Sequence, residues 1–204
     1  MTFLFYSFCM KIVLLLFCIS LSINVCSQSY QDLNLQQLTS AANDGDEVAM
    51  SFLAEIYEKG LNVDADVRMA SKWYKKAAEL NYPPAQYNYS ILLGKGKHSQ
   101  VDLPQAFFWA EKSAKQHYAP AQFLLAIYYA QGSGVEANNL LAQQWYHKAA
   151  SQDHVAAQYN LGIMLLKDSA SKESIAQGRM WIKKAADQNY AAAIKVQKLL
   201  DTNN

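Results

Sequence analysis

Apolar side chains recur along the chain with the spacing of amphipathic helices. From Ala121 they follow at positions i+4, i+7 and i+8, which lie on one face of a helix. A second run, with Trp145 between alanines, again places its apolar residues on one helical face. The pattern therefore predicts two successive α-helices in this part of the chain.

This helix pair recurs with a period of 36 residues. Four tryptophans and five alanines keep the period: Trp73, Trp109, Trp145, Trp181, Ala49, Ala85, Ala121, Ala157 and Ala193. Such a period is typical of arrays of helix pairs, in which each unit packs mainly on its neighbours. We therefore predict an all-α solenoid of helix-turn-helix units at 49–84, 85–120, 121–156 and 157–192. A capping-helix region at 28–48 precedes the units in this scheme, and a capping helix and tail at 193–204 follow them.

The predicted helix boundaries also repeat. The second helices begin with good N-cap residues at one repeat position: Asp66, Asp102, Asn138 and Ser174. They end before residues that tolerate left-handed geometry: Gly45, Asn81, His117, Asp153 and Asn189. The first helices end at Gly60, Gly96 and Gly132, with Asp168 as the exception.

Small residues recur inside both helices of each unit. The first helices carry Ala54, Ser90, Ala126 and Gly162, and the second helices carry Ala77, Ser113, Ala149 and Ala185. Small side chains let two helix backbones approach closely, and we expect the tryptophan ring to fill the wider gap beside them. A large substitution there would overpack the pair, at a cost of about 1–3 kcal/mol.

Two recurring sequence motifs resemble those of a known family. The word AQYNLG occupies 157–162, and the words WYKKAA and WYHKAA occupy 73–78 and 145–150. Together they resemble the Sel1-like repeat, a relative of the tetratricopeptide repeat with slightly longer units. The resemblance covers about residues 49–192. Ala54 and Ser90 depart from it by replacing the motif glycine, and the loop 168–173 is degraded.

The resemblance implies a right-handed α-α superhelix that acts as an adaptor between proteins, often in bacterial envelopes. Some cysteine-rich relatives are linked with β-lactam binding or hydrolysis. The paired cysteines of that branch are missing after residue 27, so this activity is not carried over to the chain.

Residues 1–27 have the pattern of a signal peptide. Lys11 is their only charge and an apolar run follows it at 12–19, which is too short for an ordinary membrane span. Val25 and Ser27 suit cleavage before Gln28. The alternatives are a lipoprotein lipidated at Cys26 and an uncleaved anchor. We therefore expect an exported protein, with the periplasm favoured over the outer membrane or the medium, and membrane contact only after lipidation.

Charge and composition exclude several functions. The chain has 18 Lys+Arg and 17 Asp+Glu, which argues against a nucleic-acid binder. All three cysteines lie within 1–27, so the rest of the chain offers no thiol chemistry or Cys-ligated zinc. The four histidines form no dense ligand cluster, and phosphate-loop and nucleophile-elbow motifs are absent from the sequence. We predict no catalytic residue, no metal, no cofactor and no enzymatic activity.

The first helices offer a candidate binding face. At 100° per residue, Phe123 and Ile127 fall on the side away from the packed set that starts at Ala121. By resemblance, this side would line the concave surface. The candidate partner-binding residues are Tyr87, Ile91, Lys95, Phe123, Ile127, Gln131, Tyr159, Ile163 and Lys167.

Two interpretations of this face stay open. These residues either complete the core or receive a protein or peptide partner, and the exposure of Tyr87, Phe123 and Tyr159 discriminates between them. The prediction is a scaffold of the bacterial envelope that binds its partner in this groove. The alternatives are a secreted hydrolase acting on cell-wall or β-lactam substrates, and an exported host-directed effector.

Lysines also recur, at Lys76, Lys112, Lys148 and Lys184. We interpret them as solvated groups that lay their stems over the helix surface near the helix C-termini. A basic stripe that binds acidic polymers is the alternative.

Overall fold

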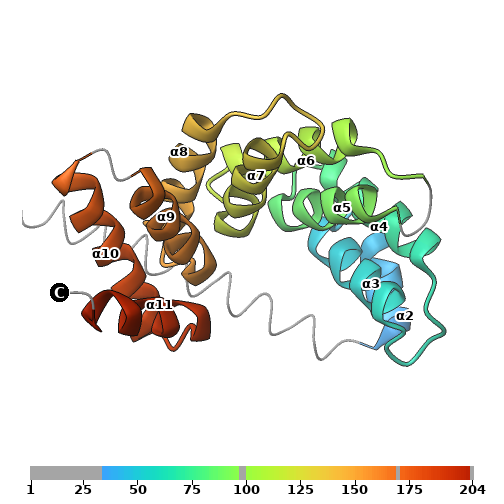
Figure 1. Cartoon of the computed structure of the whole chain (residues 1–204). Coiled ribbons are helices and arrows are strands. Elements are labelled where there is room, and N and C mark those ends of the chain that lie inside the picture. Colours follow the sequence, from blue (N-terminus) through green and yellow to red (C-terminus); the bar gives the residue numbers. More distant parts are fainter. Residues whose placement is uncertain (1–33, 97–99, 169–170, 203–204) are drawn as a thin grey trace, which may run out of the picture. The chain divides into compact units, whose positions relative to one another are not determined.

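The predicted helix pairs are present in the computed structural model, which describes residues 34–96, 100–168 and 171–202 (Figure 1). Within these ranges the chain forms ten helices and no strand. They are α2 (Leu35–Asn43), α3 (Glu47–Lys59), α4 (Val67–Glu79), α5 (Pro83–Lys95), α6 (Leu103–Lys115), α7 (Ala119–Gln131), α8 (Asn139–Ala150), α9 (Val155–Asp168), α10 (Lys172–Asp187) and α11 (Ala191–Thr202). The predicted signal peptide 1–27 lies outside the described residues.

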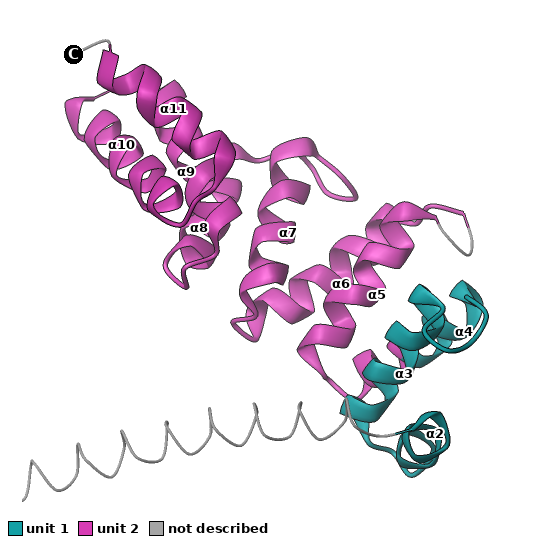
Figure 2. Ribbon diagram, turned by 90° about the horizontal axis from the view of Figure 1, so that it is seen from below, with its two compact units in different colours: residues 1–73 teal, residues 74–204 magenta. Residues whose placement is uncertain are grey.

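The chain divides into two compact units, residues 1–73 and 74–204, and the division falls within α4 (Figure 2). In the first unit α2 packs on α3. In the second unit each helix from α5 to α11 packs on the next helix along the chain. Packing between successive elements is the arrangement of a solenoid, so the predicted all-α solenoid is confirmed.

Three of the four predicted N-caps are correct. Asp66 accepts hydrogen bonds from the backbone N–H groups of Arg68 and Met69. Asp102 and Asn138 cap α6 and α8 in the same way, each accepting from a backbone N–H three residues later.

The prediction of Ser174 as the fourth cap is wrong. Helix α10 begins at Lys172, and the Oγ of Ser171 accepts the backbone N–H of Ser174 at 3.0 Å. The 36-residue alignment assumes connections of equal length. Ser171 is a good N-cap residue and lies three residues before Ser174, so α10 begins earlier than the 36-residue period predicts.

The predicted helix ends adopt left-handed geometry. Gly45 has φ 101°, and the equivalent residues Asn81, His117, Asp153 and Asn189 have φ 72°, 63°, 60° and 63°. The glycines that end α3, α5 and α7 have φ 70°, 60° and 69°. Asparagine, aspartate and histidine enter this region more readily than most residues, which explains their recurrence here.

Two glycines lie in the contact between the helices α9 and α10. A Cβ on Gly162 of α9 would lie 2.8 Å from Ile182 and 3.0 Å from the carbonyl oxygen of Gly178 in α10. In the preceding pairs the same positions hold alanine or serine, and Ala126 and Ala142 are fully buried. The small residues therefore lie where two helices are in close contact, as predicted.

A buried glutamine connects successive helix pairs. Gln86, Gln122 and Gln158 are at most 1% exposed, and each donates from Nε2 to the carbonyl oxygen of the alanine eight residues earlier. Their Oε1 atoms accept hydrogen bonds from Gln116, Gln152 and Gln188 at 2.8, 2.7 and 2.9 Å. Gln86 thus bonds to Ala78 of the preceding repeat and to Gln116 of its own repeat, so the repeated glutamine holds one repeat against the next.

Candidate functional site

The predicted partner-binding residues lie on α5, α7 and α9 of the second unit. Each of these helices carries them in the same order: a partly buried aromatic ring, a partly buried isoleucine and an exposed polar residue. The rings of Tyr87, Phe123 and Tyr159 therefore belong neither to the buried core nor to the free surface. Each of them packs against a cluster of buried residues.

Each of the three rings is held by a second ring. Tyr87 meets Tyr118 edge-on at 5.7 Å between centroids, and Tyr159 meets Tyr190 at 5.3 Å. Phe123 stacks on the imidazole of His154 at 4.6 Å with an interplanar angle of 26°. These pairs fix the orientation of the three rings before any partner arrives.

The second members of these pairs were missed by sequence reasoning. Tyr118, His154 and Tyr190 stand 36 residues apart, directly before α7, α9 and α11. This spacing of aromatic residues is visible in the sequence and equals the period of the tryptophans. No role was predicted for these three residues, because they lie in the connections between helices.

Burial sets the protonation of this face. It raises the pKa of the phenols of Tyr87 and Tyr118, with a smaller contribution from the neighbouring phenols. Burial also lowers the pKa of His154, whose Nδ1 accepts the backbone N–H of Ala157 at 3.2 Å. Tyr87, Tyr118 and His154 are therefore uncharged at neutral pH.

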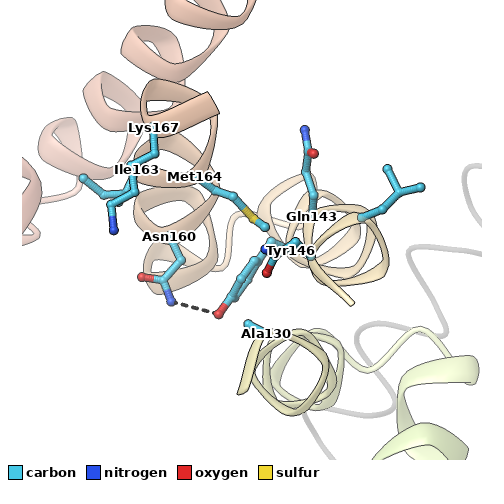
Figure 3. Close-up of a pocket in the computed structure, with 9 residues that line it drawn as sticks. Ala130, Gln143, Tyr146, Asn160, Ile163, Met164 and Lys167 are labelled. Atoms are coloured by element: carbon cyan, nitrogen blue, oxygen red, sulfur yellow. Dashed lines mark hydrogen bonds between the residues drawn. The ribbon is translucent and has the colours of Figure 1, made fainter. Parts of the chain in front are cut away.

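A cavity of about 720 Å³ lies where α7, α8 and α9 meet (Figure 3). Its lining residues are Ala130, Asn139, Leu140, Gln143, Tyr146, Asn160, Ile163, Met164 and Lys167. Two predicted binding residues, Ile163 and Lys167, are among them, whereas the other seven are not. The Nδ2 of Asn160 donates to the hydroxyl of Tyr146 at 3.3 Å across this site.

Lys112, Lys148 and Lys184 of the repeated lysines lie over aromatic rings. The Nζ atoms of Lys112, Lys148 and Lys184 are 5.1, 3.7 and 4.5 Å from the ring centres of the tryptophans three residues earlier. The carboxylates of Glu79 and Asp187 pair with the neighbouring lysines Lys75 and Lys183. These contacts agree with the interpretation that the lysines cover the helix surface.

Metal sites and membrane spans are both absent from the described residues. These residues contain no group of three or more His, Cys, Asp or Glu side chains placed to hold a metal ion. None of their helices combines the length and the apolar character needed to cross a bilayer.

Four segments of the chain match the family model described as the Sel1 repeat: 48–82, 83–118, 119–154 and 155–190. Each begins one or two residues before a unit predicted from the tryptophan period. Comparison with the curated proteins gives no match.

Solved structures with this architecture include c5321, a protective antigen present in uropathogenic Escherichia coli strains. It is 31% identical with a TM-score of 0.74, over 78% of this chain and 34% of the antigen. The chain thus spans about a third of the antigen's length. A Sel1 repeat protein from Oxalobacter formigenes is 33% identical with a TM-score of 0.58, over 62% of this chain and 96% of that protein. The immunity protein PA5088 from Pseudomonas aeruginosa is 22% identical with a TM-score of 0.50, over 76% of this chain and 56% of that protein, and shares the fold.

Proposed function

This chain belongs to the Sel1 repeat family, and we propose that it is a non-enzymatic scaffold that binds a protein or peptide partner along the face of α5, α7 and α9. Members of the family are generally protein-interaction scaffolds. The site within the chain and the nature of the partner form the new part of this proposal.

The observation that carries the proposal is the set of three fixed, partly exposed aromatic rings. Tyr87, Phe123 and Tyr159 repeat at 36-residue intervals, and a second ring holds each of them. A partner that meets preformed rings loses little side-chain entropy in the protein on binding. Aromatic anchors of this kind dominate the binding energy of many interfaces.

The polar residues beside the rings supply the rim. Lys95, Gln131 and Lys167 are exposed, one on each of the three helices. Charged and amide groups around an apolar centre are typical of binding surfaces, where they govern specificity and association rate. A partner with acidic residues around an apolar segment suits this arrangement.

A crosslinking capture from the native envelope tests the proposal. The variant with Tyr87, Phe123 and Tyr159 all changed to alanine should lose most of the recovered partner. A Phe108→Ala variant serves as the matched control, because this ring is 44% exposed on α6 and is not part of the proposed face. Undiminished recovery with the triple variant would place the binding surface elsewhere.

A second variant guards against loss of fold in the triple alanine chain. Lys95→Glu with Lys167→Glu changes only exposed residues of the rim. It should weaken capture and leave the helical circular dichroism unchanged. Turnover of peptidoglycan or a chromogenic cephalosporin by the purified chain would contradict the non-enzymatic part of the proposal.

We also propose export to the periplasm. The apolar run after Lys11 and the confinement of all three cysteines to residues 1–27 support it. Cell fractionation and N-terminal sequencing of the mature protein test the proposal. A mature chain that begins at Gln28 fits a soluble periplasmic protein, whereas one that begins at a lipidated Cys26 places it on a membrane.

A further inference from the structure

The cavity between α7, α8 and α9 has no counterpart of the same lining one repeat earlier. Two of its residues, Gln143 and Met164, stand where the preceding repeat has Phe107 and Tyr128, 36 residues before them. There the ring of Phe107 lies 6.4 Å from that of Tyr128 and 5.4 Å from that of Tyr129. Aromatic rings thus pack together at the position where the later repeat has an amide and a thioether.

A second substitution shapes one side of this cavity. Tyr146 occupies the position of Ala110, and Asn160 occupies that of Leu124. The two new side chains hydrogen bond to each other, and Tyr146 is otherwise buried (Figure 3). Part of the lining of this cavity is therefore specific to this repeat.

The lining combines an apolar part with amides and one cation. Leu140 is 66% exposed, and Ile163 and Met164 are partly exposed, so apolar surface is available to a ligand. The side-chain amides of Asn139 and Gln143 lie beside this surface, and each offers both donors and an acceptor. Lys167 is the only charged residue of the described lining.

These groups match the chemistry of an extended peptide. Paired donor and acceptor groups of an amide complement the N–H and C=O groups of a peptide backbone. Leu140 and Met164 can take an aliphatic or aromatic side chain, and a thioether adapts to its shape. Lys167, with no carboxylate in the described lining, complements a negative charge on the ligand.

We propose that this cavity binds an extended peptide segment in which a hydrophobic residue is followed by a carboxylate. The carboxylate, from a glutamate side chain or a free C-terminus, lies at Lys167, and the hydrophobic side chain lies against Leu140 and Met164. The inference rests on the proposed function and refines it, because Ile163 and Lys167 belong both to the cavity and to the proposed binding face.

The test uses fluorescein-labelled hexapeptides and fluorescence anisotropy with the purified chain. One set carries leucine or methionine followed by glutamate, a second ends in the hydrophobic residue with a free carboxylate, and a neutral set carries glutamine or a C-terminal amide instead. We expect a carboxylate set to bind more tightly than its neutral counterpart, by about two- to fivefold, because Lys167 is exposed. The difference should shrink at high salt.

Two variants copied from the preceding repeat locate the binding. Gln143→Phe introduces the residue found at 107 and should fill the cavity, with a loss of affinity of about tenfold or more. Gln144→Phe introduces the residue found at 108, next to the cavity on the same helix, and should bind the peptides as the unchanged chain does. Circular dichroism checks that both variants fold.

Several outcomes would overturn the inference. Equal binding of acidic and neutral peptides would remove the role of Lys167, and unchanged binding by Gln143→Phe would exclude the cavity. Absence of binding by every hexapeptide would exclude this class of ligand. A further outcome is that the triple alanine variant loses the captured partner while Gln143→Phe still captures it and binds every peptide as tightly as the unchanged chain. In that case the scaffold function stands and this inference is wrong.

Discussion

Gln116 donates a hydrogen bond from its Nε2 to the Oε1 of Gln86 at 2.8 Å, across 30 residues of sequence. The acceptor is fully buried, and its own amide donates to the end of the preceding helix at Ala78. The same arrangement is present at Gln122 and Gln158. A polar residue inside the core is tolerated here because its hydrogen bonds are made.

Changing Gln122 to methionine tests this contact. The variant keeps a similar side-chain volume but removes two hydrogen bonds of Gln122, one to the carbonyl of Ala114 and one from the amide of Gln152. We expect the free energy of unfolding to fall by about 1–3 kcal/mol, because each lost bond is worth about 0.5–1.5 kcal/mol. Urea denaturation measures this change. Gln131→Met, at an exposed position of the same helix, is the control, and equal stability of the two variants would contradict the role of Gln122.

Changing Gly162 to alanine tests the close approach of α9 and α10. The new Cβ would meet Ile182 at 2.8 Å and backbone of Gly178 at 3.0 Å, so the helices must move apart. We expect a loss of about 1–3 kcal/mol in the free energy of unfolding from overpacking. Ile182→Ala removes the nearest atoms, so the double variant should lose less stability than the two single changes together. Strict additivity would show that the clash does not exist.

The imidazole of His154 makes stability depend on pH. Burial lowers its pKa in the folded state, whereas the unfolded chain keeps the ordinary value of about 6.5. The unfolded state therefore binds more protons below this pH, and stability should fall as pH drops from about 6.5 towards the lowered pKa. Thermal unfolding between pH 7.5 and pH 5 measures the effect.

His154→Tyr is the matched variant for this measurement, because Tyr118 and Tyr190 occupy the same repeat position. It should remove the contribution of His154 to the acid loss and keep a ring beside Phe123. His117→Asn, which introduces the residue found at 81 and 189, should keep the acid loss. An unchanged pH profile in His154→Tyr would assign the dependence to other groups.

The start of α10 provides a test of the corrected N-cap. Ser171→Ala removes the hydroxyl that accepts the backbone N–H of Ser174, and we expect a cost of about 0.5–2 kcal/mol. Ser174→Ala keeps that backbone bond and should change stability by less than about 0.5 kcal/mol. Urea denaturation of the two variants compares them directly. A larger loss in Ser174→Ala would restore the cap predicted from the period.

The 36-residue period in the sequence is sufficient to predict most of the fold. Tryptophan and alanine recur because one helix-pair environment is built four times, and the residues at the left-handed helix ends recur because few side chains tolerate that geometry. The misplaced cap at Ser174 shows the limit of this reasoning. A period predicts the average length of a connection, whereas the N-cap depends on which side-chain hydroxyl lies close enough to accept a free backbone N–H of the first turn.

The candidate site was predicted less completely. The face that carries Tyr87, Phe123 and Tyr159 follows from helical geometry, but their exposure depends on partners 31 residues later in the chain. The buried role of Gln86 was also missed, because glutamine is usually exposed and its partners Ala78 and Gln116 lie eight residues before it and 30 residues after it.

The sequence by itself determined the helices, their pairing and their number of repeats, because these depend on local geometry repeated at a fixed interval. Only the tertiary structure decided how far the rings of the binding face are covered and where a cavity opens. The cavity depends on the combined volumes of side chains from α7, α8 and α9, which no single segment of sequence contains. The sequence shows that Gln143 and Met164 replace Phe107 and Tyr128 of the preceding repeat. Only the packing in three dimensions shows that they line a cavity.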